Sequence, residues 1–527
     1  MKKLHSFFLI VLLVTGGLIS SCSDDDDETI KKPEIENPDD TTGEEYITDD
    51  TAFGNFFAYN AINDIYLWKY EIANSMKSWK LADNPIKKVE EIRYKENGKD
   101  VDRWTQVTDN FTAFTSGVDG VETTYGYDVQ LYWADNEHSF IVAVVTQTYA
   151  DSPARRAGLQ RGDVIVTVNG KKMTTGAYQE LVEELLYSQS VRLGIADGET
   201  VKEISLNAVK MYEDPVLLDS VYDVNGKKVA YLAYSSFTLD SNAKLIEVCK
   251  KFKQAGASEL ILDLRYNGGG YVITQNLLTS MLAPQAEVQN HSVFETEIWN
   301  KDYMEYFKET GEDLETRFTT KFEYKHNGQT YSYNTGDANI GINKIYALVT
   351  ESSASASESL LVDLMPYMDI EIIGMQTHGK YCTGNMIGAK DWYESMDTYF
   401  KKHPDESAVW KEWSQWEKHM KTDWGIYVMI NRYGDKNGDN PCMPNGLTPD
   451  TKVEDNPFEP YQLGDENEAM LKVALTKAGK VYPAGVRSIQ PSLKALPEQP
   501  HGVFFGKLIA LPDLKYIHSF KKDGFVQ

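Results

Sequence analysis

A serine-rich turn and a lysine that follows it along the chain are the residues best suited to chemistry. The run Ser353-Ala354-Ser355-Ala356-Ser357-Glu358 follows the apolar segment 345–350 and precedes a helical pattern over 358–365. A hydroxyl at such a strand-to-helix turn becomes a nucleophile when a base lies within hydrogen-bond reach and amide N–H groups face the developing oxyanion. Taken alone, a Ser/Ala run before a helix is more often a flexible cap.

The lysine lies in His378-Gly379-Lys380, in the loop after the strand predicted over 370–374. In mostly apolar surroundings, desolvation lowers the pKa of a lysine and allows it to act as a general base. Alone, such a lysine is most often solvated. A Ser-His-Asp triad that uses His378 is an alternative, but no Gly-x-Ser-x-Gly elbow surrounds Ser355, and a loop neighbour is the simpler interpretation of the histidine.

Together these elements resemble the C-terminal-processing, or tail-specific, serine peptidases. In that family the middle serine of Ser-Ala-Ser-Ala-Ser-Glu is the nucleophile and a Gly-Lys lysine 25 residues later is the base, which is the spacing from Ser355 to Lys380. The resemblance therefore implies catalytic roles for these two residues. It also implies supporting roles for Glu358 and Thr377, which match the family pattern.

The segment Asp263-Leu264-Arg265-Tyr266-Asn267-Gly268-Gly269-Gly270 resembles the glycine-rich element of the same family. The resemblance implies that the amides of Gly270 and Ala356 hold the oxyanion. We expect glycine at 270 because a side chain would keep a carbonyl oxygen away from the amide. One departure is Gly384, where the family often has a glutamine that orients the lysine. Asn385 is expected to substitute, and without such a partner for Lys380 the enzyme would be slow.

A second resemblance covers about 90 residues before the core. The segment 152–159 followed by 161–170 (Arg-Gly-Asp-Val-Ile-Val-Thr-Val-Asn-Gly) resembles a PDZ domain of the circularly permuted kind found in bacterial proteases. Such domains bind an extended chain terminus by strand addition, with loop amides around its carboxylate. The implied peptide-binding residues are Tyr125, Gly126, Tyr127 and Asp128. An inward-facing Asp128 would repel a carboxylate, so capture of a free C-terminus stays open.

The N-terminus resembles a bacterial lipoprotein signal. Two lysines precede the apolar run Phe7–Val14, and Ile19-Ser20-Ser21-Cys22 follows as a lipobox. The resemblance implies lipidation of Cys22 and a place in the cell envelope, lipid-anchored to the outer membrane and either periplasmic or surface-exposed. The alternative is an ordinary secretory signal that is cleaved elsewhere. The acidic run 24–28 is equally compatible with a surface-sorting signal and a solvated spacer.

The pattern as a whole predicts a multidomain α/β protein, because strands and helices alternate from about 227 to 465. The resemblance implies a core of the ClpP/crotonase-like type. The predicted segments are a signal peptide (1–21), a disordered acidic tether (22–50), a helical N-terminal domain (51–120), a PDZ domain (121–212), a Ser/Lys peptidase core (213–480) with insertions at about 285–343 and 391–422, and a C-terminal extension (481–527).

The composition of the chain argues against several other classes of protein. The 79 acidic and 53 basic residues give a net charge of -26, which argues against a nucleic-acid binder. Four cysteines without paired spacing exclude a disulfide scaffold and a zinc ribbon, although a Cys382–Cys442 disulfide stays open. We expect no cofactor and no metal. The segment 435–440 resembles the start of a calcium loop, but Gly446 stands where a glutamate is needed, so a turn is favoured.

Three tryptophans, Trp410, Trp413 and Trp416, recur at three-residue steps within 407–421. We interpret this segment as a helix that packs on the core, with an aromatic lid over the active site as the alternative.

The predicted function is that of a lipid-anchored serine endopeptidase that cleaves extracytoplasmic proteins or peptides with a Ser-Lys dyad, while the PDZ domain guides the substrate. The alternative is a catalytically weak or inactive peptide-binding surface lipoprotein, in which Gly384 marks a decayed site.

Overall fold

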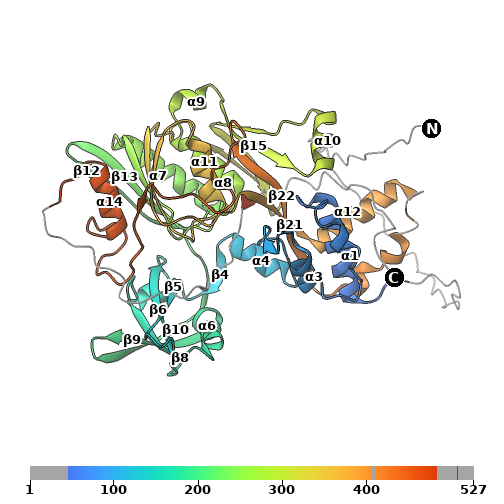
Figure 1. Cartoon of the computed structure of the whole chain (residues 1–527), viewed down its shortest axis with the longest axis horizontal. Coiled ribbons are helices and arrows are strands. Elements are labelled where there is room, and N and C mark those ends of the chain that lie inside the picture. The colour runs from blue at the N-terminus through green and yellow to red at the C-terminus, as the bar shows by residue number, and fades with distance from the viewer. Residues whose placement is uncertain (1–45, 405–406, 408–409, 483–506, 509–527) are drawn as a thin grey trace, which may run out of the picture.

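The structure is a computed structural model that describes residues 46–482, apart from 405–406 and 408–409, together with residues 507–508. The predicted signal peptide, Cys22, most of the predicted tether and nearly all of the predicted C-terminal extension lie outside the described residues. Figure 1 shows a helical part beside the α/β core and a separate PDZ part below it. Among the described residues no helix has the length and apolar character to cross a membrane.

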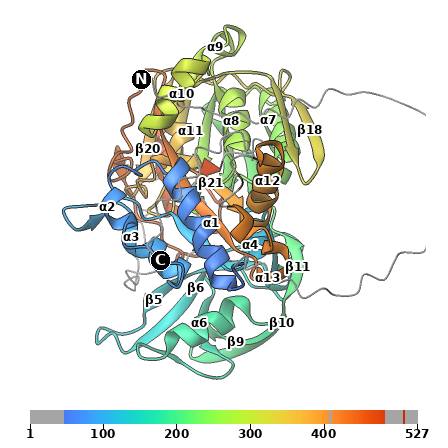
Figure 2. The ribbon, with the colours of Figure 1, turned by 90° about the vertical axis from the view of Figure 1, so that its right-hand side faces the viewer.

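The helical part is built around α1 (Asp50–Ile65), which is buried on most of its surface. It is covered by α12 (Ala389–Lys402) and by a tryptophan-rich segment from the predicted second insertion (Figure 2). Phe56 stacks on Trp413 with ring centroids 3.7 Å apart. The remaining helices are α2 (Ala73–Met76), α3 (Pro85–Ile92) and α4 (Phe111–Val118).

The three tryptophans of that segment are all buried, at 4%, 3% and 3% exposure. The indole N–H groups of Trp410 and Trp416 donate to the carboxylate of Asp397 at 2.5 and 3.0 Å. The packing interpretation is therefore confirmed and the lid alternative is wrong. The expected continuous helix is also wrong, because the segment forms a 3₁₀ turn, η3 (Trp410–Trp413), followed by the short helix α13 (Trp416–His419).

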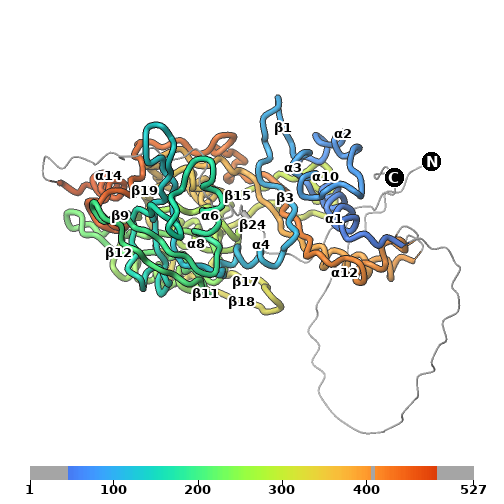
Figure 3. The backbone as a smooth tube through the Cα atoms, turned by 90° about the horizontal axis from the view of Figure 1, so that it is seen from below, coloured from blue at the N-terminus to red at the C-terminus, as the bar shows by residue number. Residues whose placement is uncertain are grey.

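The PDZ part is an antiparallel sheet with strand order β10-β9-β7-β6-β5, in which β8 pairs with β6. Its elements are β5 (Tyr127–Trp133), β6 (Phe140–Thr148), α5 (Pro153–Arg156), β7 (Val164–Val168), β8 (Met173–Thr174), α6 (Tyr178–Tyr187), β9 (Ser190–Asp197) and β10 (Thr200–Asn207). Two short antiparallel strands, β4 (Val121–Thr124) and β11 (Val209–Tyr212), connect it to the rest of the chain. Figure 3 shows this part in front of the core, seen from below.

The described residues of the core form a six-stranded sheet with order β12-β13-β14-β19-β20-β23. All neighbours pair in parallel except β12 and β13, and the central strands are buried on both faces, as parallel sheets require. Helices α7, α8 and α11 pack on one face and α14 on the other. The bounds are β12 (Val216–Val224), β13 (Lys227–Tyr234), α7 (Asn242–Gln254), β14 (Glu259–Asp263), α8 (Val272–Leu282), β19 (Lys344–Val349), α11 (Ala356–Leu364), β20 (Asp369–Gly374), β23 (Thr451–Lys452) and α14 (Ala469–Lys477). The predicted multidomain α/β fold is confirmed.

A further sheet joins the core to the helical part, with order β16-β15-β22-β21-β24 and with β3 (Gln106–Thr108) also paired to β22. Its long central strand β22 (Gly425–Asp435) lies between β15 (Val293–Trp299) and β21 (Cys382–Gly388). The other elements of this region are α9 (Gln285–Gln289), α10 (Lys301–Thr310), β16 (Glu315–Arg317), the hairpin β17 (Lys321–His326) and β18 (Gln329–Asn334), and β24 (Lys507–Leu508). This sheet brings β22 beside the loop that carries Lys380.

A buried ionic cluster connects the PDZ part to the core. Arg161 of the PDZ part donates to Asp455 at 2.6 Å, and Arg265 of the core donates to the same oxygen at 2.8 Å. Arg265 also binds Glu468 at 2.6 Å. All four side chains are at most 8% exposed, so the charges compensate one another away from water.

Candidate active site

Ser355 lies between the end of β19 and the first residue of α11, where the sequence predicts a strand-to-helix turn. Its backbone has φ 58° and ψ -111°, a conformation that side-chain-bearing residues rarely adopt. Such a residue costs on the order of 1–3 kcal/mol and is retained only where its surroundings enforce it. The strain is therefore consistent with a position that is fixed for chemistry.

Glu358 connects the serine turn to the lysine loop. Its carboxylate is fully buried, and one oxygen accepts the backbone N–H of Ser355 at 2.9 Å and that of Lys380 at 2.8 Å. The other oxygen accepts the N–H of Gly379 at 2.7 Å and the hydroxyl of Thr377. The structure thus brings three of the predicted residues, Ser355, Thr377 and Lys380, to the carboxylate of a fourth, Glu358.

Tyr433 of β22 adds a second connection between the same segments. Its hydroxyl donates to the carbonyl of Lys380 at 2.9 Å and lies 3.5 Å from the carbonyl of Ser355. Sequence reasoning did not identify this residue, because no local motif relates a strand residue to a loop more than fifty positions earlier.

The side chain of Lys380 is 1% exposed, and this burial lowers its pKa to about 7. Its Nζ donates to the hydroxyl of Tyr427 at 3.0 Å and lies over the rings of Tyr427 and Trp104, at 4.7 and 5.4 Å from their centroids. Within the described part of the chain, Nζ makes no hydrogen bond to Ser355. Because catalytic hydrogen bonds often form only with substrate, this separation does not exclude the pair.

Both side chains are closed to solvent, since Ser355 is 0% exposed. Trp104, from the helical part, covers Lys380 and donates its indole N–H to Nε2 of His378 at 3.4 Å. Arg103 donates to the carbonyl of the same histidine. His378 thus lies in the wall of the site, as the loop-neighbour interpretation predicts, and a substrate reaches Ser355 only when the covering side chains move.

The glycine-rich loop lies against the serine turn. The carbonyl of Asn267 accepts the N–H of Ala354 at 3.1 Å and the hydroxyl of Ser357 at 2.9 Å. Among the described residues, the N–H groups of Gly270 and Ala356, which are the predicted oxyanion donors, make no hydrogen bond. Gly270 has φ 144°, and a Cβ there would lie 2.5 Å from the carbonyl oxygen of Phe237. A side chain at position 270 would therefore collide with the backbone of Phe237. This reason for glycine differs from the predicted one, which was access of a substrate carbonyl to the amide.

In this structure the side-chain oxygen of Asn385 does not accept a hydrogen bond from Lys380. This oxygen, Oδ1, is buried without a hydrogen-bond partner among the described residues, and Tyr427 instead contacts the lysine. Tyr427 is a residue that sequence reasoning missed. It lies on β22, and no motif in the sequence connects it to Lys380.

Comparison with known protein families gives matches over two segments of the chain. Residues 228–392, which contain the serine turn, the glycine-rich loop and Lys380, match the family model described as Peptidase family S41. The chain carries a peptidase family S41 domain. Residues 144–195 match the family model described as PDZ domain. The predicted family resemblance is therefore confirmed.

Two named proteases are similar to this chain in sequence, and one solved structure shares its fold. The chain is 27% identical over 270 residues to a "Probable CtpA-like serine protease" of Staphylococcus aureus, which is 51% of this chain and 46% of that protein. A "Carboxyl-terminal-processing protease" of Picosynechococcus is 27% identical over 123 residues, 23% of this chain and 30% of that protein. The matches thus span less than half the length of these relatives. A crystal structure from Bacteroides fragilis NCTC 9343, named as an S41 protease, is 20% identical with a TM-score of 0.58 and covers 80% of this chain and 96% of that chain, which shows the shared fold.

The predicted peptide-binding loop of the PDZ domain is closed by its own side chains. The hydroxyls of Tyr125 and Tyr127 donate to the carbonyls of Ser188 and Leu185 at the end of α6. Both rings are buried, at 1% and 4% exposure, and they stack with centroids 6.0 Å apart. They thereby join the edge strand β5 to α6.

The backbone N–H of Gly126 in this loop is also used in a hydrogen bond within the protein. Gly126 donates its N–H to the Thr124 hydroxyl at 2.9 Å. Beside it, the carboxylate of Asp128 accepts hydrogen bonds from Gln147 and, at 2.9 Å, from Tyr149, while burial raises the pKa of this carboxyl. A terminal carboxylate would thus meet an occupied amide and an acidic neighbour.

Other features singled out from the sequence lie outside this site. Cys382 and Cys442 are both free, so the structure contains no disulfide between them. Both are buried, and burial raises the pKa of each thiol. Asp435 accepts the N–H groups of Asn437 and Asp439 at 2.7 and 3.0 Å, as expected of a turn.

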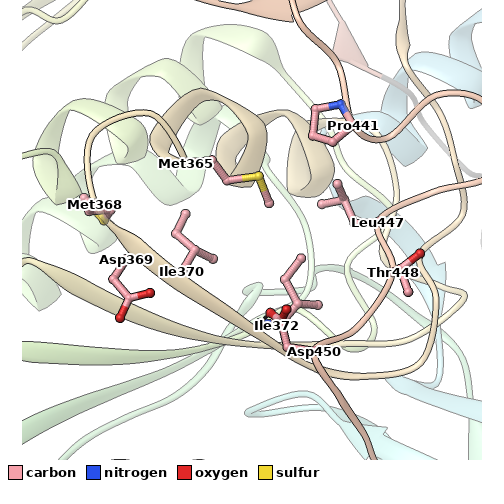
Figure 4. Close-up of a pocket in the computed structure, with 9 residues that line it drawn as sticks. All are labelled: Met365, Met368, Asp369, Ile370, Ile372, Pro441, Leu447, Thr448 and Asp450. Carbon is pink, nitrogen blue, oxygen red and sulfur yellow. Dashed lines mark hydrogen bonds between the residues drawn. The ribbon is translucent and has the colours of Figure 1, made fainter.

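A cavity of about 530 Å³ lies at the edge of β20 and is shown in Figure 4. It is lined by residues of the segments 365–372 and 441–450, among them Met365, Ile370 and Leu447. None of the predicted catalytic residues of the S41 domain lines it.

Proposed function

We propose that the protein is a serine endopeptidase in which Ser355 is the nucleophile and Lys380 the general base. The observation that carries this proposal is the shared carboxylate of Glu358, which holds the backbone of a strained serine and of a buried lysine at one point. A lysine with a pKa of about 7 is half neutral near neutral pH and can accept a proton.

The proposed reaction assigns one step to each of these groups. Nζ of neutral Lys380 takes the hydroxyl proton of Ser355 while Oγ bonds to the carbonyl carbon of the scissile peptide. The negative charge that develops on the carbonyl oxygen is stabilised by the N–H groups of Gly270 and Ala356. The resulting ammonium gives its proton to the departing amine as the C–N bond breaks, and water then hydrolyses the acyl-enzyme by the same route.

The substrates we propose are extracytoplasmic proteins or peptides that the PDZ domain guides to the site. The chain enters the envelope through its N-terminal signal and is anchored to the outer membrane by a lipid on Cys22, facing the periplasm or the cell surface. The basis for the location is the lipobox Ile19-Ser20-Ser21-Cys22 after an apolar run. Replacing Cys22 by Ser should release the protein from the membrane fraction and abolish labelling with a radioactive fatty acid.

The inactive alternative rested on Gly384. The contact between Lys380 and Tyr427 favours the enzyme, because it gives the lysine a polar partner that the sequence alone did not provide.

The test is cleavage of a loosely folded protein, such as casein, by the purified chain. Replacing Ser355 by Ala should abolish cleavage, and replacing Lys380 by Ala should do the same. Ser352→Ala is the matched control, because this serine lies in the same turn and is partly exposed. Undiminished cleavage by the Ser355→Ala variant would contradict the assignment. Peptide binding without turnover in the unmodified protein would favour the alternative.

A further inference from the structure

The ring of Tyr427 on β22 occupies the space that a side chain at position 384 on the neighbouring strand β21 would fill. A Cβ atom built on Gly384 would lie 2.3 Å from Cζ and 2.4 Å from Cε2 of Tyr427. These distances are far below ordinary van der Waals contact, so the tyrosine ring occupies the place that any side chain at 384 would need. Only glycine at 384 admits this ring.

The hydroxyl of Tyr427 lies next to the proposed base, Lys380. Lys380 Nζ donates to that hydroxyl at 3.0 Å, and this is its one hydrogen bond to a described residue. Both residues are buried, at 1% exposure each, so no water competes strongly for the contact. The hydrogen bond therefore fixes where Nζ lies.

We propose that Tyr427 is the residue that positions Lys380, and that glycine at 384 is the condition for this arrangement. This inference rests on the proposed function. A lysine has four rotatable side-chain bonds, and a general base works only if its lone pair faces the serine hydroxyl. One N–H that donates to Tyr427 selects the orientation and leaves the lone pair free. The partner comes from β22 and not from the lysine's own loop.

The arrangement also connects the base to the helical part of the molecule. Tyr427 is paired with Gln106 of β3, and β3 begins two residues after Trp104, whose ring lies over Lys380. Positioning of the lysine thus depends on a strand that both parts of the chain share.

The first test is Tyr427→Phe, which keeps the ring and removes only the hydroxyl. We expect kcat to fall on the order of tenfold to a hundredfold with KM nearly unchanged, since misplacement of a catalytic group by about 1 Å has effects of this size. The acidic limb of the pH profile should move to lower pH, because the hydroxyl oxygen stabilises the ammonium form. The other groups that act on Nζ are Cys382, Asp102, Glu358 and Arg103, and all remain in the variant.

The second test is reciprocal rescue. Gly384→Gln alone should be nearly inactive, because its side chain collides with the ring, and Tyr427→Ala alone should be slow. In the double variant Gly384→Gln, Tyr427→Ala the ring no longer blocks a glutamine, and the end of the flexible Met429 side chain, whose Cε lies 2.5 Å from the new Cβ, has to move aside. We expect this variant to exceed Tyr427→Ala severalfold. Met429→Leu is the packing control, since Met429 also borders Gly384 but, among the described residues, forms no hydrogen bond with Lys380 Nζ. Its pH profile should match that of the unmodified protein.

A titration by NMR separates the two hypotheses. In the Ser355→Ala background with ¹³C-labelled lysine, Lys380 should titrate near 7, and at lower pH after Tyr427→Phe. If the unmodified protein cleaves nothing, the proposed function fails, while the titration still tests the positioning contact. If the unmodified protein is active and Tyr427→Phe equals it in kcat, pH profile and lysine titration, the positioning role is overturned and the peptidase stands.

Discussion

The carboxylate of Glu358 accepts the backbone N–H of Lys380 at 2.8 Å, and the same oxygen accepts the N–H of Ser355 at 2.9 Å. Replacing Glu358 by Gln keeps the shape but turns one acceptor oxygen into a donor NH₂ group, which faces N–H groups or a hydroxyl. We expect a loss of at least a hundredfold in kcat and about 1–3 kcal/mol in the free energy of unfolding. Steady-state kinetics and urea unfolding measure both.

The matched control for this substitution is Glu351→Gln, because Glu351 is exposed and lies just before the same turn. It should leave kcat and stability unchanged within error. Equal behaviour of the two variants would mean that Glu358 does not organise the site.

Strain at Ser355 predicts an order of stability among inactive variants. Glycine adopts positive φ without steric cost, whereas alanine does not, so at φ 58° and ψ -111° Ser355→Gly should relieve the strain that Ser355→Ala retains. We expect Ser355→Gly to be more stable than Ser355→Ala by about 1 kcal/mol. Thermal unfolding of the two proteins checks this, and an alanine variant as stable as the glycine variant would contradict the strain argument.

The lowered pKa of Lys380 predicts the pH dependence of catalysis. Only the neutral amine accepts a proton, so kcat/KM should rise as the pH increases through about 7 and then level off. Lys380→Arg stays protonated throughout and should be inactive from pH 6 to pH 9. A flat profile over this range, or activity in the arginine variant, would exclude Lys380 as the base.

The sequence predicted the elements that local patterns determine. The buried strands of the core, the serine turn, the glycine-rich loop and the PDZ order all have signals within a few residues. The contact between Lys380 and Tyr427 has no such signal, because strand pairing brings together residues 47 positions apart. Closeness in sequence favours Asn385 as the lysine partner, but on β21 its Oδ1 has no hydrogen-bond partner among the described residues. The partner of Lys380 is thus determined by the pairing of β21 with β22 and not by the local sequence motif.

The structure of the PDZ loop predicts that the rate of cleavage does not depend on whether the substrate has a free C-terminal carboxylate. The amide of Gly126 is engaged by Thr124, and Asp128 lies beside it, so a free carboxylate gains no donor there. Matched peptides with free and amidated C-termini should be cleaved with equal kcat/KM within about twofold, a difference of roughly 0.4 kcal/mol. A free acid that reacts tenfold faster would show that the loop opens to capture carboxylates.

The ionic cluster predicts the acid stability of the contact between the PDZ domain and the core. Burial acts to raise the pKa of Asp455, but Arg161 and Arg265 hold it at about 2, below the ordinary value of 3.8. A carboxyl whose pKa is depressed in the folded state stabilises the fold fully above its unfolded pKa and loses that contribution as the pH falls from about 4 to about 2. The shift corresponds to a stabilisation on the order of 2–3 kcal/mol.

Asp455→Asn tests this contribution. At pH 7 the variant should lose about 3–5 kcal/mol of stability, since two buried guanidinium groups lose a charged partner. The difference from the unmodified protein should shrink as the pH falls toward 2, where about half of the Asp455 side chains are protonated in the folded protein. Chemical unfolding between pH 2 and pH 7 measures the two curves. Asp465→Asn is a suitable control, because Asp465 is partly exposed and, among the described residues, its Oδ1 accepts hydrogen bonds only from its near neighbour Asn467. A constant gap between the Asp455→Asn and unmodified curves would contradict the assigned pKa.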